Sequence, residues 1–375
     1  MRRRAWLAAL LLATVRPGRA AGDDPVRRGR VLQFPRDHGA HLGAAIEWWY
    51  LTGELQADGG ARYGFQLTFF RSRTGLAESL DSRFAPRHLL FAHAALSDLG
   101  ARQHRHAQRV ARWSGDPQAA LARASLQDTD LLLGGWTLQR ADDGGRSLYR
   151  TRFASDGAGT PADAFALALE LRATQPPLLQ GDAGFSRKGP AEAQASHYLS
   201  EPQLQARGEL RRDGRRVAVQ GRAWLDHEWS DTLLHPEAVG WDWIGMNLDD
   251  GGALTAFRLR RADGSSLWAG GSYRSPGGAL RNFDPGELRF TPGPSWTSPS
   301  SGARYPLQWQ VDTPAGRFGV RALFDAQELD SRASTGTVYW EGLAELSDAD
   351  QRRVGSGYLE MTGYAGRLRL GEPGS

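Results

Sequence analysis

The chain has 375 residues and no cysteine, which excludes disulfides, catalytic thiols, thiolate metal ligands and a lipid-anchoring cysteine. A chain of this length fits two domains better than one. Residues 1–20 contain five arginines and no acid, so removing them takes the formal net charge from +4 to −1. A nearly neutral remainder with scattered arginines argues against a nucleic-acid partner.

Residues 1–20 have the pattern of an export signal. Residues 2–4 are all arginine, an apolar run follows at 5–15, and the small residues of 18–21 allow cleavage after Ala20. The apolar run is too short to span a bilayer as a helix. We therefore predict a signal peptide, read by the Sec or the twin-arginine route, and a periplasmic or secreted protein.

Strand patterns dominate the remainder. Residues 48–55 and 63–70 are apolar and aromatic, and the turn Asp58-Gly59-Gly60 between them predicts a hairpin. Later segments have the same character, namely 134–140 with 147–153, then 164–173, then 205–211 with 216–225. Helical patterns are few, and residues 117–127 could form one short helix. The chain is therefore expected to be all-β, with the strands closing into barrels that leave no free edge.

The first aromatic hairpin recurs in the second half of the chain. Trp48 and Tyr50 precede the first Asp-Gly-Gly turn, and Trp241 and Trp243 precede a second one at residues 250–252. Residues i and i+2 lie on one face of a strand, so both hairpins would present paired aromatic side chains. This repeat predicts two similar β-domains that meet between about residues 224 and 240.

Residues 224–230, Trp-Leu-Asp-His-Glu-Trp-Ser, form the densest cluster of chemically capable side chains. On a strand, Trp224, Asp226 and Glu228 share one face. If that face points into a barrel, burial raises the pKa of a carboxyl group and keeps it protonated, so that it can act as an acid. If the face points to solvent, the carboxyl groups are only hydrated.

Other polar residues favour structural interpretations. Glu47 lies beside aromatic residues and is expected to accept a hydrogen bond from a neighbouring backbone amide. His93 lies between apolar neighbours and is expected to be a hydrogen-bonded core histidine. His104 and His106 share a strand face without a third ligand nearby, so we predict no metal site. The chain has no nucleophile elbow and no phosphate-binding loop before a helix, so we predict no cofactor.

Six segments carry a shared pattern: EWWYLTGEL (47–55), FQLTFFR (65–71), FAHAALSD (91–98), HYLSEP (197–202), WLDHEW (224–229) and GYLEMTGY (357–364). Together they resemble the AttH-like, carotenoid 1,2-hydratase group of lipocalin-like secreted proteins. The resemblance implies two tandem lipocalin-like antiparallel β-barrels, which agrees with the repeat. We place the N-terminal barrel at 26–223 and the C-terminal barrel at 224–370.

The resemblance also implies a chemistry. The hydratases of this group add water across a terminal double bond of an acyclic carotenoid, which requires an acid and a shielded carbocation. Their catalytic aspartate falls on Asp226 and their histidine on His197. At two accompanying aromatic positions, this chain has Trp224 in place of tyrosine and Leu199 in place of tryptophan.

The first hypothesis is therefore an exported hydro-lyase acting on a hydrophobic, isoprenoid-like substrate. Asp226 would be the general acid and His197 its hydrogen-bonding partner. The residues expected to contact the substrate are Trp224, Trp241, Trp243, Tyr198 and Glu228.

Two alternatives belong to other classes of function. One is a periplasmic carrier of a lipid or other apolar ligand, which needs a cavity but tolerates loss of the acid. The other is an accessory subunit of an envelope transport complex, which needs neither and would instead expose an apolar patch. None of the three hypotheses includes a nucleic-acid partner, and the first two require a hydrophobic small-molecule ligand.

Overall fold

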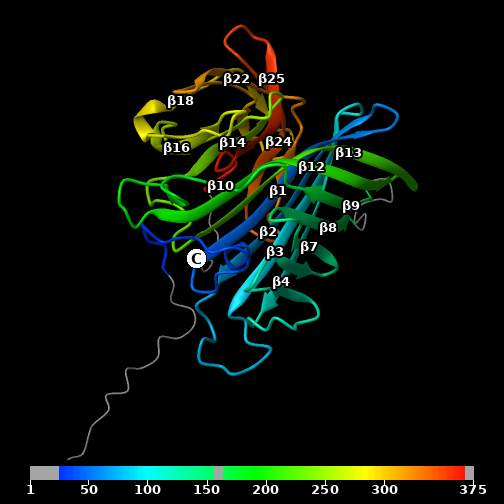
Figure 1. Cartoon of the computed structure of the whole chain (residues 1–375), viewed down its shortest axis with the longest axis vertical. Helices are drawn as coiled ribbons and strands as arrows, with labels where there is room; N and C mark the ends of the chain where they lie inside the picture. Colours follow the sequence, from blue (N-terminus) through cyan, green and yellow to red (C-terminus); the bar gives the residue numbers. More distant parts are fainter. Residues whose placement is uncertain (1–24, 156–163, 368–375) are drawn as a thin grey trace, which may run out of the picture.

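A computed structural model describes residues 25–155 and 164–367 (Figure 1). The predicted signal peptide at 1–20 lies outside these residues. Antiparallel strands make up nearly all of the regular structure, and the short 3-10 helices η1 (Arg36–His38) and η3 (Pro285–Glu287) lie between them. The all-β prediction is thus confirmed. In the described part of the chain, no helix is long and apolar enough to cross a membrane.

The first half of the chain forms a nearly closed sheet, here called sheet A, with the strand order β4-β3-β2-β1-β13-β12-β9-β8-β7-β6-β5 and with β10 and β11 paired to β12. Its strands are β1 (Ile46–Ala57), β2 (Arg62–Arg73), β3 (His88–Asp98), β4 (Gln103–Trp113), β5 (Ala122–Ala124), β6 (Asp130–Leu133), β7 (Trp136–Asp142), β8 (Ser147–Ser155), β9 (Phe165–Arg172), β10 (Leu178–Leu179), β11 (Phe185–Arg187), β12 (Ala195–Arg212) and β13 (Arg215–Ser230).

The second half forms sheet B, with the order β17-β16-β15-β14-β25-β24-β22-β21-β18 and with β23 paired to β24. Its strands are β14 (Gly240–Leu248), β15 (Ala253–Arg260), β16 (Ser266–Arg274), β17 (Leu280–Phe283), β18 (Arg289–Pro292), β21 (Gln308–Thr313), β22 (Gly316–Ala322), β23 (Glu328–Asp330), β24 (Val338–Ser347) and β25 (Arg353–Met361). The short strands β19 (Ser295–Thr297) and β20 (Arg304–Pro306) pair separately.

Two sequence expectations differ from this arrangement. Residues 117–127, expected to include a helix, contain the strand β5, because Ala122 and Ala124 are buried and pair with β6. The predicted domain boundary at 223/224 falls inside β13, which pairs with β1 and β12 as far as Ser230. The chain therefore passes from sheet A to sheet B between Ser230 and Gly240.

Successive residues of β1 face two different compartments. Trp49, Leu51 and Leu55 are buried in the core enclosed by sheet A, whereas Trp48 and Tyr50 belong to a cluster that joins sheet A to sheet B. Sheet B has its own apolar core. In Figure 1, β1, β12 and β13 lie where the blue-to-green sheet A meets the yellow-to-red sheet B. These strands therefore contribute to both the N-terminal core and the contact between the sheets.

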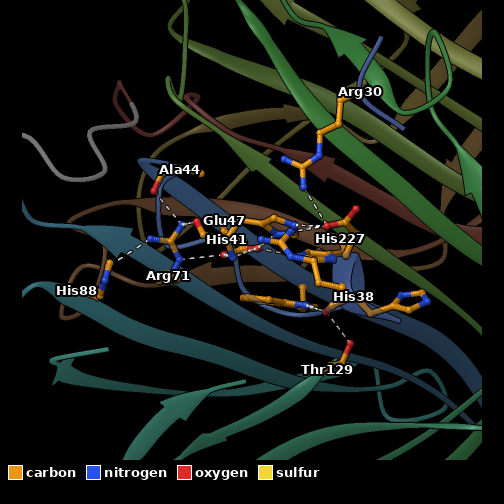
Figure 2. Close-up of polar contacts among 12 residues, drawn as sticks. Arg30, His38, His41, Ala44, Glu47, Arg71, His88, Thr129 and His227 are labelled. Carbon is orange, nitrogen blue, oxygen red and sulfur yellow. Dashed lines mark hydrogen bonds and ion pairs between the residues drawn. The ribbon is translucent and has the colours of Figure 1, made fainter. Parts of the chain in front are cut away.

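A buried polar network ties the segment before β1 to sheet A (Figure 2). Glu47 accepts hydrogen bonds from the backbone N–H of His41 at 3.0 Å, from Arg71 Nε at 2.9 Å and from His227 Nε2 at 3.0 Å. The prediction that Glu47 caps a backbone amide is thus confirmed. Burial alone would raise the pKa of Glu47, but Arg71 and the two histidines hold it well below its usual value. Because His227 points into this network, it fixes β13 from the face opposite Asp226.

Candidate functional site

A cavity lies between sheets A and B; about 870 Å³ of space around it is not filled by atoms, and part of that space is open solvent. Its walls come from β1, β2 and β11 to β13 on one side and from β14, β15, β24 and β25 on the other. Eight of the 19 residues that line it are aromatic: Trp48, Tyr50, Phe70, Tyr198, Trp241, Trp243, Phe257 and Tyr339. Four carboxyl side chains also line it: Asp226, Glu228, Glu341 and Glu360. The acidic face of residues 224–228 therefore points into a space between the sheets, and not into the interior of one barrel.

Strand register explains why these side chains meet. Trp48 of β1 lies opposite Glu228 of β13, which in turn lies opposite Tyr198 of β12. Two residues along, Tyr50 lies opposite Asp226 in the same way. Because side chains alternate between faces with period two, both rungs point toward sheet B.

The repeated aromatic hairpins supply part of both walls, as β1–β2 and β14–β15. Trp48 and Tyr50 line the cavity from sheet A, and Trp241 and Trp243 line it from sheet B. The second strands differ, since residues 65 and 67 are buried in the sheet A core whereas residues 257 and 259 line the cavity. The loop of the first hairpin is one residue longer, and a one-residue change reverses the face on which every following side chain lies.

Asp226 is held by three hydrogen-bond donors. Its Oδ2 accepts a bond from the Tyr198 hydroxyl at 2.7 Å, and its Oδ1 accepts bonds from the Ser200 hydroxyl at 2.6 Å and from Trp224 Nε1 at 2.7 Å. Burial raises the pKa of Asp226 to about 7, against the lowering effect of these three donors. Since Oδ2 accepts only one of the three bonds, it is the oxygen with room for a proton.

His197 does not share this face. It is the neighbour of Tyr198 on β12, so its ring points to the other side of the sheet, where it lies 5.4 Å from the Trp229 ring and Nε2 accepts a bond from the backbone N–H of Arg27. The expectation that His197 is the hydrogen-bonding partner of Asp226 is therefore corrected. That position is taken by Tyr198 and Ser200, because the register places Ser200 opposite Asp226 and Tyr198, two residues away, lies on the same face of β12.

The aromatic residues predicted to contact a substrate have two different placements. Trp241, Trp243 and Tyr198 line the cavity. Trp224 is buried beside it, with its ring edge-on to Trp243 at 6.3 Å, and reaches the site through its bond to Asp226. Leu199, the second departure from the hydratase pattern, is buried on the opposite face in a cluster with Trp229. The indole N–H of Trp224 and the hydroxyl of Tyr198 thus both serve Asp226.

Two further carboxyl groups face Asp226 from sheet B and escaped the sequence analysis. Glu341 of β24 lies directly opposite Glu360 of β25. Burial raises the pKa of Glu360 to about 8 and that of Glu341 well above its usual value, and Glu360 adds to the effect on Glu341. Among the described residues, neither carboxyl oxygen of Glu341 has a hydrogen-bond partner of normal geometry. An acid beside aromatic residues on a strand, as in Tyr339-Trp340-Glu341, is the signal that could have found it.

Lys188 is the third residue that the sequence analysis passed over. It is the only lysine of the chain, it follows β11, and it lines the cavity beside Glu228 with its ammonium 3.4 Å from Glu228 Oε1. Burial lowers the pKa of Lys188, while Glu228 acts to raise it. Its position could not be deduced from the sequence, because no local pattern indicates that the short strand β11 pairs with β12.

A set of side chains with metal-ligand chemistry lies outside the cavity. The nearest atoms of His41, Glu47 and His227 all fall within 4.8 Å of one another. Glu47 is also paired with Arg71, and the other ring nitrogen of His41 lies 3.1 Å from Asp37 Oδ1. A cation would have to displace these hydrogen bonds beside the Arg71 charge, so the geometry favours a polar network over a metal centre.

His93 also has a structural role. Its ring nitrogens lie 2.8 Å from the Tyr339 hydroxyl and 2.8 Å from Ser334 Oγ, and its side chain is buried. The expectation of a hydrogen-bonded core histidine is confirmed. Because Tyr339 lines the cavity from sheet B, this contact helps to hold the two sheets around it.

Comparison with known proteins now identifies the family. A family model described as AttH-like matches residues 25–364. The chain belongs to the AttH-like family. A crystal structure of a putative AttH from Nitrosomonas europaea is 44% identical, with a TM-score of 0.82 over 91% of this chain and 99% of that one. No curated protein sequence matches the chain.

Two more distant structures share the fold of this AttH-like protein. Kievitone hydratase from Nectria haematococca has 16% identity and a TM-score of 0.65, over 91% of this chain and 94% of that one. CghA in complex with Sch210972 has 13% identity and a TM-score of 0.50, over 92% of this chain and 95% of that one. At these identities the likeness establishes the lipocalin-like arrangement of the AttH-like chain.

Proposed function

We propose that the protein hydrates a carbon–carbon double bond of a hydrophobic, isoprenoid-like substrate by acid catalysis in the cavity between the sheets. The observation that carries this proposal is the Asp226 carboxyl group, which is buried in an aromatic-lined cavity with a pKa raised to about 7. A carboxylic acid that keeps its proton near neutral pH, in a space that shields a cation from bulk water, is the combination that alkene protonation requires.

The reaction can be balanced with Asp226 alone. The proton on Asp226 Oδ2 is transferred to the less substituted alkene carbon, and the electron pair of the double bond forms the new C–H bond. The resulting cation lies on the more substituted carbon, where faces of Tyr50, Trp241 and Trp243 can stabilise it. Water then forms the C–O bond, and its surplus proton returns to the Asp226 carboxylate. The product is a tertiary alcohol.

Asp226 is preferred over Glu341 as the donor for two reasons. A general acid works best when its pKa lies near the working pH; the pKa of Asp226 is raised to about 7, whereas burial and the neighbouring Glu360 raise that of Glu341 well above its usual value. The three donors also fix the orientation of Asp226, whereas Glu341 has no such support among the described residues. Kievitone hydratase, a protein of the same fold, is named as an enzyme that adds water.

The test is incubation of the purified protein with geraniol and with squalene in oxygen-18 water. The proposal predicts that the wild type forms an alcohol carrying one labelled oxygen, and that Asp226→Asn forms at least about 100-fold less. A substrate that binds to the wild type and is recovered without label would contradict hydration. Native mass spectrometry showing the same unchanged ligand on both proteins would instead identify a carrier.

We also propose that the protein acts outside the cytoplasm. The support is the pattern of residues 1–20. Cell fractionation with an antibody against residues of the mature chain tests this, and a protein retained in the cytoplasm at full length would contradict it. If the exported protein is recovered without bound envelope proteins, this result would contradict the hypothesis that it is an accessory subunit of a transport complex.

A further inference from the structure

One end of the cavity carries a buried ion pair that the hydration mechanism does not use. Lys188 is 8% exposed, and its ammonium lies 3.4 Å from Glu228 Oε1 and 5.3 Å from the centre of the Trp48 ring. Both members of the pair line the cavity. Lys188 is the only lysine of the chain, and all its other permanently charged basic residues are arginines. The cavity therefore contains an ammonium group in place of the guanidinium group found elsewhere.

This pair has hydrogen-bonding capacity left over. A lysine ammonium can donate three hydrogen bonds, and the side chain of Lys188 makes one, to Glu228, within the described part of the chain. Ser186 and Ser196, which pair with each other across β11 and β12, line the same cavity. Burying a charged pair is unfavourable unless its remaining hydrogen-bonding groups find partners, so this end of the cavity is suited to a polar group of the ligand.

The strand fixes the distance between this polar end and the proposed acid. Glu228 and Asp226 lie on the same face of β13, two residues apart. A strand rises about 3.3 Å per residue, which separates the two carboxyl-bearing positions by about 7 Å. A ligand that spans both would carry its polar group about 7 Å from the double bond.

The opposite charges of Lys188 and Glu228 determine which polar group of a ligand can bind between them. The charges of Lys188 and Glu228 balance, so the site has little net preference for an anion or a cation. A hydroxyl group can accept a hydrogen bond from the Lys188 ammonium and donate one to the Glu228 carboxylate. A carboxylate would be repelled by Glu228, and an ammonium group would be repelled by Lys188.

We propose that the Lys188–Glu228 pair binds a hydroxyl group of the substrate, and that the substrate class is therefore an isoprenoid alcohol rather than a hydrocarbon. From the proposed function, this inference takes only the presence of a double bond beside Asp226. Binding of a hydroxyl group does not require the hydration reaction, so it can be measured without turnover.

The experiment measures equilibrium binding by quenching of tryptophan fluorescence, with Asp226→Asn included so that no turnover disturbs the reading. The probes are geraniol, its hydrocarbon analogue 2,6-dimethyl-2,6-octadiene, geranic acid and geranylamine. Extended geraniol places its hydroxyl and its distal double bond at about the separation of the two sites. Hydrogen bonds to charged groups predict that geraniol binds at least about tenfold more tightly than the hydrocarbon and the two charged analogues.

The test variant is Lys188→Met combined with Glu228→Gln, which removes both charges without leaving one of them buried alone. It should lose the preference for geraniol and keep its affinity for the hydrocarbon. Arg112→Met, which removes a positive charge from an exposed position of β4, is the matched control and should keep the preference. Lys188→Met alone should also lose the preference, and dimethylation of Lys188 should be slowed by geraniol.

The outcomes separate the two proposals. Geraniol that binds with the expected preference and is not hydrated by the wild type would contradict the proposed function and support the hydroxyl site. Equal binding of alcohol and hydrocarbon, a preference that survives in the double variant, or no binding of geraniol would overturn the hydroxyl site.

Discussion

Replacing Asp226 by asparagine should change how the stability of the protein depends on pH. In the folded protein, burial raises the pKa of Asp226 from 3.8 to about 7. Between these two values the folded state holds a proton that the unfolded state has lost, so the free energy of unfolding falls as pH rises. The contribution of Asp226 is fully present below its unfolded pKa and is lost as pH rises through about 7.

The size of the effect follows from the shift. One unit of pKa corresponds to about 1.4 kcal/mol, so a rise of roughly three units corresponds to about 4 kcal/mol at most. Asparagine has no proton to lose and keeps the shape of the protonated acid. The difference in unfolding free energy between the two proteins should therefore change by up to about 4 kcal/mol between about pH 4 and pH 8, in favour of the variant at high pH.

Urea unfolding of both proteins across this pH range measures the difference directly. Glu341 and Glu360 are present in both proteins, so most of their own titration cancels. Asp58→Asn in the exposed turn after β1 is the matched control and should run parallel to the wild type. If Asp226→Asn also runs parallel to the wild type, Asp226 is not protonated in the folded protein and the reasoning is refuted.

Three further changes have expected outcomes. Tyr198→Phe removes a donor that lowers the pKa of Asp226, so this pKa should rise and hydration should persist to higher pH. The pH–rate profile measures the shift, and an unchanged profile would contradict the role of the Tyr198–Asp226 hydrogen bond. Arg71→Met leaves the Glu47 carboxylate buried without its cation and should destabilise the protein by about 3–5 kcal/mol in denaturant unfolding, whereas a loss below about 1 kcal/mol would show that the network carries little stability. Glu341→Gln should change the hydration rate less than about tenfold if Asp226 is the proton donor, and a loss as large as that of Asp226→Asn would move the donor role to Glu341.

Period-two patterns in the sequence predicted the part of the site that lies on single strands. The shared face of Trp224, Asp226 and Glu228 and the paired tryptophans of β14 follow from alternation alone. The same rule, applied to β12, places His197 and Tyr198 on opposite faces, so only one of them can meet Asp226. The family pattern pointed to the histidine, and the register of β12 against β13 decides for the tyrosine.

The rest of the site depends on contacts between distant segments. Glu341 and Glu360 reach the cavity only because sheet B packs on the outer face of β1 and β13. Lys188 lies beside Glu228 only because β11 pairs with β12. No local pattern fixes which face of a closed sheet meets a second sheet. The position of the cavity, between the sheets and not inside one barrel, could not be read from strand periodicity for the same reason.

The pH dependence of hydration by the wild type and by Asp226→Asn tests the central claim most directly. With geraniol as substrate, the wild-type rate should be constant at low pH and fall as pH rises through about 7, because the acid loses its proton. The variant should be at least about 100-fold slower at low pH and should lack this decline. A wild-type rate that increases with pH, or a variant that keeps the wild-type rate and profile, would contradict the claim that Asp226 donates the proton.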